Sequence, residues 1–377
     1  MSPATPEDQE APDATRASEP NGRRARVDPH AARAARGRPR RVAVVGAGLA
    51  GLTLTRALLE RGEDVTCFDK GRGPGGRMST RRADPFAFDH GAQYFTARDP
   101  AFRAEVEAWC AAGVAARWTG RLAVFGGPDD GAGPFQRQDL GALGARDERF
   151  VGVPGMNAIG RRLGAALGPA LRQGVRVASV APRAGGGYDL ADDAGAALGA
   201  FDSVLVTTPP SQAAPLVAAS PELAALAASV AMDPCWAVMV AFEAPLEAGC
   251  DGAFVNGGAF SWIARDSSKP ERGAGEAWVL HASAEWSKAH LERTPDEIVA
   301  LAREALGRVI GASLPPEVYA AAHRWRFAAA APPLEVDAAF DAARSLGIAG
   351  DWLAGSKVQG AWRSGRALAA RFLRDCD

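Results

Sequence analysis

Apolar residues along this chain alternate between short continuous runs and longer stretches with helical spacing. The first unit places an apolar run at 42–45, apolar residues at helical spacing over 49–59, and a second apolar run at 65–68. Short apolar runs between turn residues indicate buried strands, and a period of about 3.6 residues indicates an amphipathic helix. We therefore predict a strand, a helix and a second strand, which is how a Rossmann-like α/β domain begins.

The rest of the chain continues this mixture of elements. Helices are expected from Gly155 to Leu167, after the capping-box sequence at 294–297, and from Val358 to Leu373. Further strands are expected at 175–177, 188–190, 201–207, 236–242, 260–265, 278–283 and 345–351. The strands between residues 236 and 283 predict a second, α+β domain on a mostly antiparallel sheet.

A glycine-rich turn joins the first strand to the first helix. Gly46, Gly48 and Gly51 have the G-x-G-x-x-G order, and Asp69 ends the second strand. Gly46 permits the tight turn, Gly48 lets a pyrophosphate approach the backbone, and Gly51 lets the helix pack on the strand. Asp69 is expected to bind the adenosine ribose. The motif predicts a dinucleotide site, but it does not distinguish NAD from FAD.

A second glycine-rich run follows Asp69 directly. Lys70 leads into Gly-Arg-Gly-Pro and then into Gly75, Gly76 and Arg77. The two glycines let the backbone approach the pyrophosphate, and the Arg77 guanidinium suits phosphate oxygens. Together the two loops indicate a bound FAD.

Several segments resemble renalase-type flavoproteins, relatives of the monoamine oxidase and p-hydroxybenzoate hydroxylase fold group. The similar segments, in the same order, are 70–82, 89–96, 150–156, 233–236, 261–265, 278–283 and 350–352. The resemblance covers roughly residues 40 to 374. One departure is Asp266, at a position where the resemblance leads us to expect an amide.

Pattern and resemblance together imply an FAD-binding domain interleaved with a substrate domain. The predicted FAD-binding segments are 39–105, 150–210 and 332–377, and the predicted substrate segments are 106–149 and 211–331. Residues 1–38 are expected to be a disordered tail, because they are rich in Pro, Ala, Arg and acids and lack apolar periodicity. We favour an upstream extension or a misassigned start over a weak acidic-partner site in this tail.

Composition narrows the class of protein. The chain has 377 residues, 47% of them hydrophobic and 23% charged, with a net charge of −1. A charge of that size gives no reason to expect a nucleic-acid or membrane partner. The five cysteines are odd in number and include no C-x-x-C pair, which favours free thiols in a reducing, cytoplasmic compartment. No metal-ligand spacing is present in the sequence.

The resemblance also places further residues against the cofactor. It implies that Val177 touches the adenine through backbone atoms, that His90 or Gln93 lies by the flavin edge, and that Asp351 binds the ribitol and pyrophosphate region.

A helix opening with Gln359, Gly360 and Ala361 would point its positive end at the flavin pyrimidine. No cysteine lies near residues 358–365, so the FAD is expected to be non-covalent.

Renalase-type enzymes oxidise the 2- and 6-dihydro isomers of NAD(P) to NAD(P)⁺, and dioxygen then gives hydrogen peroxide. The resemblance implies this dihydronicotinamide dinucleotide substrate here, and hydride transfer from it requires positioning and no general base. The candidate catalytic residues are His281, for the carboxamide, and the aromatic residues Trp286 and Trp325, which suit stacking on a flat ring.

Two alternatives remain open from the sequence. The first is a flavin amine oxidase or desaturase on the same fold, although none of the four lysines lies in a predicted strand. The second is a non-catalytic protein that binds flavin or a nucleotide without turnover.

Overall fold

The computed structural model describes residues 38–127, 134–141, 147–273 and 275–375. Residues 39–377 form one compact unit. Of the tail predicted at 1–38, only residue 38 is among the described residues. The short segments between the ranges above lie outside them as well.

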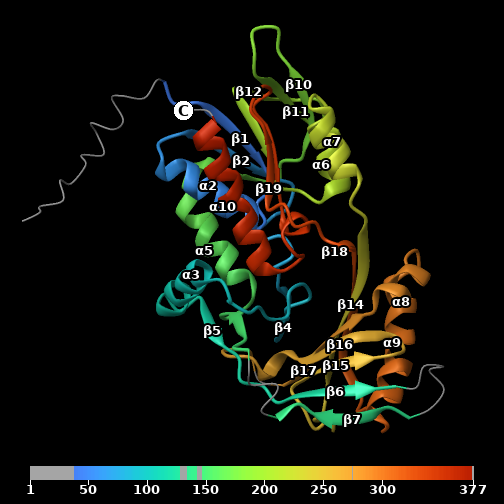
Figure 1. Ribbon diagram of the computed structural model, residues 1–377. Coiled ribbons are helices and arrows are strands. Elements are labelled where there is room, and N and C mark those ends of the chain that lie inside the picture. The colour runs from blue at the N-terminus through green and yellow to red at the C-terminus, as the bar shows by residue number, and fades with distance from the viewer. Residues whose placement is uncertain (1–37, 128–133, 142–146, 274, 376–377) are drawn as a thin grey trace, which may run out of the picture. The chain divides into compact units, whose positions relative to one another are not determined.

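The first layer of this unit is a mostly parallel sheet of six described strands (Figure 1). In sheet order they are β19 (Ala338–Asp341), β20 (Leu346–Ala349), β13 (Ser203–Val206), β1 (Arg41–Val45), β2 (Asp64–Asp69) and β9 (Leu171–Gln173). Neighbours are parallel except at β19–β20, which are antiparallel. This arrangement is that of the predicted Rossmann-like domain.

Helices cover both faces of the six-stranded sheet. Its alternating residues divide between two cores, because neighbouring side chains of a strand point to opposite faces. Val42 and Val44 share a core with α2 (Leu49–Glu60), α5 (Asn157–Leu167) and α10 (Val358–Asp375).

Ala43 and Val45 share the other core with α6 (Pro210–Leu216) and α7 (Pro221–Ala228). Beside α6 lies a small antiparallel meander of β10 (Val177–Pro182), β11 (Tyr188–Asp192) and β12 (Ala197–Phe201).

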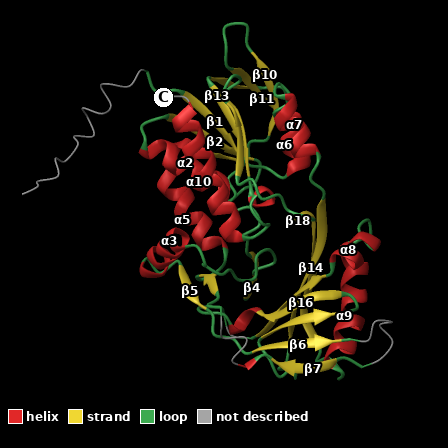
Figure 2. Ribbon diagram, viewed as in Figure 1, coloured by secondary structure: helices red, strands yellow, loops and turns green. Residues whose placement is uncertain are grey.

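The second layer is a sheet of seven described strands (Figure 2). In order they are β18 (Glu317–Ala330), β14 (Met232–Phe242), β17 (Glu276–Ala282), β16 (Phe260–Arg265), β15 (Gly252–Asn256), β6 (Leu122–Gly126) and β7 (Gln136–Asp139). Neighbours are antiparallel except at β15–β6, which are parallel. The mostly antiparallel sheet of the second domain is thereby confirmed.

Helices α8 (Ala284–Ala289) and α9 (Pro295–Ile310) lie along one face of the seven-stranded sheet. The capping box predicted at the start of α9 is present, with Thr294 and Glu297 each accepting from the other's backbone. Apolar residues of α9 such as Ile298 and Leu306 pack on Trp236 and Val238 of β14.

Smaller elements connect the two sheets. They are β3 (Arg81–Ala83), β4 (Phe86–Phe88), α3 (Pro100–Ala111), β5 (Ala115–Arg117) and β8 (Phe150–Gly152). Short 3-10 turns occur at Gly168–Ala170, Asp266–Ser268 and Asp351–Leu353.

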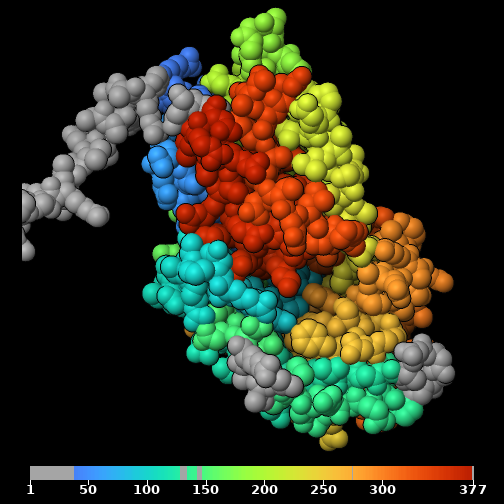
Figure 3. Space-filling model, in the orientation of Figure 1, coloured from blue at the N-terminus to red at the C-terminus, as the bar shows by residue number. Residues whose placement is uncertain are grey.

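Several predicted boundaries fall inside packed elements. The boundary at 105/106 cuts through α3. The boundary at 210/211 cuts α6 after its first residue, and α7 lies in the predicted substrate segment. Both helices nevertheless pack on β1 and β13, and on the visible face they adjoin the C-terminal segment (Figure 3). The strand expected at 175–177 is displaced, because β9 ends at Gln173 and β10 begins at Val177. The pattern of each element gave its apolar face but not the partner of that face.

Within the described part of the chain, no helix is long and apolar enough to cross a membrane.

Candidate active site

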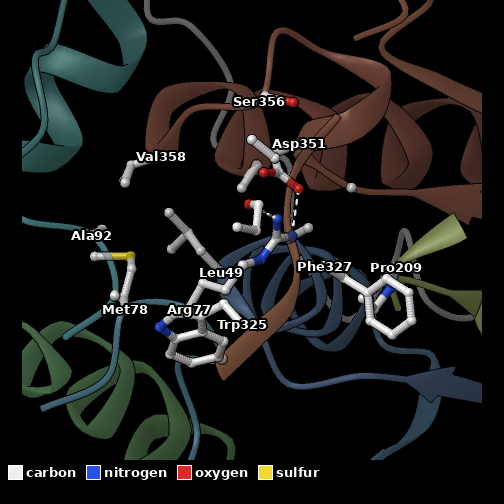
Figure 4. Close-up of a pocket in the computed structure, with 18 of the residues that line it drawn as sticks. Leu49, Arg77, Met78, Ala92, Pro209, Trp325, Phe327, Asp351, Ser356 and Val358 are labelled. Atoms are coloured by element: carbon white, nitrogen blue, oxygen red, sulfur yellow. Dashed lines mark hydrogen bonds and ion pairs between the residues drawn. The ribbon is translucent and has the colours of Figure 1, made fainter. Parts of the chain in front are cut away.

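A large cavity of about 2150 Å³ lies between the two sheets. Its wall includes the turn after β1, the glycine-rich loop after β2, the segment around His90, the middle of β18 and the start of α10. Segments far apart in the sequence meet here, and Figure 4 shows ten of their residues labelled around the cavity.

The glycines of the first turn serve two different purposes, close packing and the approach of a ligand. A Cβ on Gly46, where φ is +110°, would lie 2.8 Å from Thr207 Oγ1, and one on Gly51 would lie 1.8 Å from the Gly46 carbonyl oxygen. A Cβ on Gly48 would have no described atom within 4 Å. Gly46 and Gly51 are therefore required by packing, while Gly48 leaves room for a ligand beside the backbone.

Helix α2 begins directly at this turn. None of the described side chains caps its N-terminus, and its first turn carries no acidic residue. Its first-turn N–H groups and the positive end of its dipole therefore suit an anionic ligand.

The second glycine loop lies against the first. The Gly75 N–H donates to the Ala47 carbonyl oxygen at 2.8 Å, and Gly48 and Gly75 form a bridge. Gly75 and Gly76 have φ values of +115° and +56°, in the left-handed region that favours glycine. Both loops thus offer bare backbone to the same end of the cavity.

Asp69 holds the two loops together. Its carboxylate accepts from the N–H of Ala47 at 2.5 Å and from the N–H of Gly71 at 2.6 Å, and it lines the cavity. Lys70 donates to the Gln212 side-chain oxygen at 3.1 Å, and burial lowers the pKa of Lys70. The carboxylate predicted to bind a ribose therefore stands at the nucleotide end of the wall.

Arg77 and Asp351 form an ion pair of 2.6 Å across the cavity wall (Figure 4). Arg77 also donates to the Ala328 carbonyl oxygen of β18 at 2.9 Å. Two residues assigned separately to the cofactor from sequence are thus in contact. The pair fixes the guanidinium beside the glycine loops, where it suits a pyrophosphate.

The start of α10 forms another part of the wall. The Gln359 side-chain oxygen accepts from the backbone N–H of Arg98 at 2.8 Å and of Asp99 at 3.1 Å. A Cβ on Gly360 would lie 2.2 Å from the Ala354 carbonyl oxygen, so this approach requires glycine. Gln359, Gly360 and Ala361 line the cavity, as Val177 does at the nucleotide end.

An aromatic group forms the wall at β18. The His90 carbonyl oxygen accepts from Trp325 Nε1 at 2.9 Å and contacts His281 Nε2 at 3.2 Å. Because a carbonyl only accepts, His281 carries its proton on Nε2 in this arrangement. The His90 ring stacks on the Trp325 ring with 5.3 Å between centroids. The rings of His323 and His90 meet edge to face, with 4.8 Å between their centroids.

These imidazoles are uncharged near neutral pH. Burial lowers the pKa of His90 and of His281 to about 4, and it also lowers the pKa of His323. The wall is therefore a set of neutral, flat rings. Sequence reasoning missed His323, although its alternation with Trp325 on one strand places both on the same face.

One sequence prediction needs correction, and the choice between His90 and Gln93 falls to His90, which lines the cavity. Trp286 is on α8, where it stacks on His290 with 4.1 Å between centroids, and it is not among the described residues that line the cavity. Gln93 turns away from the cavity, donates to the Asp89 carbonyl oxygen and accepts from Lys269. Gly51 lies behind the wall and serves packing, the role predicted for it in the motif. The number of tryptophans in a segment does not predict which of them face the cavity and which lie on the helix side of the sheet.

Cys235 lines the cavity, but burial raises the pKa of its thiol to about 12. It therefore stays a thiol near neutral pH and is unsuited to forming a flavin link.

Among the described residues, no group of three or more His, Cys, Asp or Glu side chains could hold a metal ion. The fit to a dinucleotide is good: two bare glycine loops, an uncapped helix N-terminus, Arg77 beside them and a carboxylate for the ribose.

Comparison with known proteins agrees with this site. Residues 44–108 match the model of an NAD(P)-binding Rossmann-like domain, and residues 121–373 match that of flavin-containing amine oxidoreductases. The second match covers more than half of the chain, so the protein belongs to the flavin-containing amine oxidoreductase family. Its cofactor is FAD, held without a covalent bond.

Similar proteins extend the comparison. The chain is 49% identical over 61 residues to hydroxyneurosporene desaturase of Rubrivivax gelatinosus, a match that covers 16% of this chain and 12% of the desaturase. It is 46% identical over 52 residues to the zeta-carotene-forming phytoene desaturase of Myxococcus xanthus, covering 14% of this chain and 10% of the relative. The chain therefore aligns with only about a tenth of these curated relatives.

Solved structures match over a longer span. A protein assigned as protoporphyrinogen oxidase from Exiguobacterium sp. 255-15 has a TM-score of 0.69 and 14% identity. Putrescine oxidase bound to putrescine has a TM-score of 0.66 and 16% identity. Each comparison covers 89% of this chain and 99% of the other chain. At such identities the similarity shows the fold alone.

Proposed function

We propose that this protein is an FAD-dependent oxidase of renalase type. Its substrates would be the 2- and 6-dihydro isomers of NAD(P), and its products NAD(P)⁺ and, with dioxygen and a proton, hydrogen peroxide. When bound, FAD supplies the hydride acceptor and the route of the electron pair to dioxygen.

The observation that carries the proposal is the neutral aromatic wall around the His90 carbonyl. Trp325 presents a large flat ring, and the three neighbouring imidazoles are uncharged near neutral pH. A dihydropyridine is neutral, flat and already a hydride donor, so it needs a surface to stack on and no base.

The proposed roles follow from the hydrogen bonds. His281 uses its Nε2 proton toward the His90 carbonyl, which leaves Nδ1 as an acceptor for a carboxamide N–H. Trp325 is held in place by its bond to the same carbonyl and would orient the nicotinamide ring. The sequence already suggested that His281 binds the carboxamide. For Trp325, the hydrogen bond to the His90 carbonyl adds a reason why its ring keeps one orientation.

The size of the cavity also favours a second dinucleotide. Pockets for one ligand are typically about 300–1000 Å³. The cavity here, at about 2150 Å³, has room for FAD together with another large ligand.

The competing function is oxidation of an amine or desaturation of a hydrocarbon. The family match and the fold of putrescine oxidase favour it. Lys269 does not act from the cavity in the described structure, because it is buried among carboxylates behind the wall.

Peroxide release in air separates these functions. Purified protein is supplied in turn with the 2- and 6-dihydro isomers, ordinary NADH and putrescine. The proposal predicts one peroxide for each NAD(P)⁺ formed from the isomers, and no comparable rate with the amine. Turnover of putrescine without turnover of the isomers would support the competing function instead.

A further inference from the structure

Four charged side chains lie buried together behind the cavity wall. Asp89, Asp266 and Lys269 have fully buried side chains, and that of Arg272 is 2% exposed. Lys269 Nζ lies 2.5 Å from Asp266 and 3.5 Å from Asp89. Arg272 bonds Asp89, and its Nε lies 3.5 Å from Asp266. We call these four residues the buried ionic cluster.

The buried ionic cluster joins three separate segments. Asp89 accepts from the Thr80 hydroxyl at 2.7 Å and from the Met156 N–H at 2.8 Å. Arg272 donates to the Gly152 carbonyl oxygen at 3.1 Å. The loop after β16, the loop after β8 and the segment before His90 are therefore tied to one another.

The cluster also reaches the back of the cavity wall. Lys269 donates to the Gln93 side-chain oxygen at 3.3 Å, and Gln93 donates in turn to the Asp89 carbonyl oxygen. Both ends of the turn 89–93 therefore bind the cluster on the side away from the cavity, Asp89 through its ion pairs and Gln93 through Lys269. On its other side, the His90 carbonyl orients His281 and Trp325.

The buried ionic cluster is sensitive to the loss of any one of its charges, because its positive and negative charges balance. Two carboxylates face two cations, and burial of a charge is costly unless it is paired. Burial acts to raise the pKa of Asp89, but Lys269 and Arg272 together hold it below its ordinary value. Burial raises the pKa of Asp266, although Lys269 opposes this. Asp266 is also the residue at which this chain departs from the amide expected by resemblance.

We propose that Asp266 and Lys269 are positioning residues for hydride transfer. They act through their opposite charges: as long as these balance, the turn 89–93 keeps the place in which the His90 carbonyl fixes His281 and Trp325 at the cavity wall. The substrate-dependent part of this inference rests on the proposed function. The part concerning the bound flavin does not.

The test compares Lys269→Met, Asp266→Asn and the double variant that carries both changes. Each single change leaves an unpaired charge, whereas the double variant restores balance. We expect the rate constant of flavin reduction at saturating substrate to fall about tenfold or more in each single variant. The double variant should return to within about threefold of the unaltered protein. Arg303→Met, which breaks an exposed pair with Glu317 on the other face of the sheet, is the matched control.

A second readout needs no substrate. The visible circular dichroism of bound FAD reports its asymmetric surroundings, and we expect it to change in each single variant and to recover in the double variant. FAD affinity should stay within about threefold, because the glycine loops are untouched.

Unchanged reduction rates and dichroism in both single variants would overturn the inference. A double variant no better than the worse single variant would also overturn it. If Lys269→Met does not fold, Asp266→Asn and the double variant decide. If no dihydronicotinamide reduces the unaltered protein, the proposed function fails, while the dichroism still tests the positioning.

Discussion

His281 is the single side chain on which the proposed substrate contact most depends. Replacing it with leucine removes the donor to the His90 carbonyl and the Nδ1 acceptor, at nearly the same volume. We expect the KM for 2- and 6-dihydro-NAD to rise about tenfold, the effect of roughly 1.4 kcal/mol of lost binding.

Trp286→Phe is the matched control for that variant, since Trp286 lies on α8 away from the cavity. Stopped-flow reduction over a range of substrate concentrations measures both. Equal effects of the two substitutions would contradict the role assigned to His281.

The two most shifted imidazoles make stability depend on pH. The pKa of His90 and of His281 falls from 6.5 to about 4 on folding, because burial disfavours the charged ring. Between these values the unfolded chain binds protons that the folded protein does not, so stability is lost as pH falls from 6.5 towards 4. Each histidine contributes roughly 3 kcal/mol to this loss.

Urea unfolding at a series of pH values measures the dependence. The slope of unfolding free energy against pH should become shallower in His281→Leu, because one titrating group is gone. The same slope in both proteins would show that His281 keeps its ordinary pKa in the fold.

At the scale of elements, the turn between β1 and α2 separates two kinds of glycine. A methyl group at Gly51 would lie 1.8 Å from a backbone oxygen, whereas one at Gly48 would project into open space. Gly51→Ala should therefore prevent stable folding. Gly48→Ala should leave the fold intact and weaken FAD binding about tenfold or more.

Thermal unfolding of the FAD-free protein and titration with FAD separate these effects. A Gly48→Ala protein that unfolds as early as Gly51→Ala would mean that both glycines serve packing. Full FAD affinity in Gly48→Ala would mean that the pyrophosphate does not approach at this turn.

The elements that sequence predicts well are those with a local signal. The G-x-G-x-x-G turn, the capping box before α9 and the strand at 260–265 all follow from neighbouring residues, and all are present. Pairings over long distances are different, because their two halves carry no signal of each other. The contact of Arg77 with Asp351, 274 residues apart, and the buried ionic cluster are of this kind.

The wrong prediction for Trp286 has the same physical cause, the lack of a local signal for a distant partner. Trp286 and Trp325 are both aromatic residues of the second domain, and period alone does not distinguish the helix side of its sheet from the cavity side. Packing on His290 decides the first case, and the bond to the His90 carbonyl decides the second.

At the scale of the whole molecule, residues 39–377 form one compact unit that contains all the described cavity residues. A chain that begins at residue 39 should therefore fold, bind FAD and be reduced at the same rate as the full chain. Parallel purification and stopped-flow reduction of the two proteins measure this. A shortened protein that loses flavin or reduction would assign the first 38 residues a part in the site.

The account rests most directly on which molecule reduces the flavin. The decisive measurement mixes the FAD-loaded protein without oxygen with each dihydro-NAD isomer separately and follows the flavin band at about 450 nm. We predict rapid bleaching by the 2- or 6-dihydro isomer and very slow bleaching by ordinary NADH. Bleaching by an amine such as putrescine, with none by the isomers, would contradict the proposed function and leave the fold and the FAD site as they are.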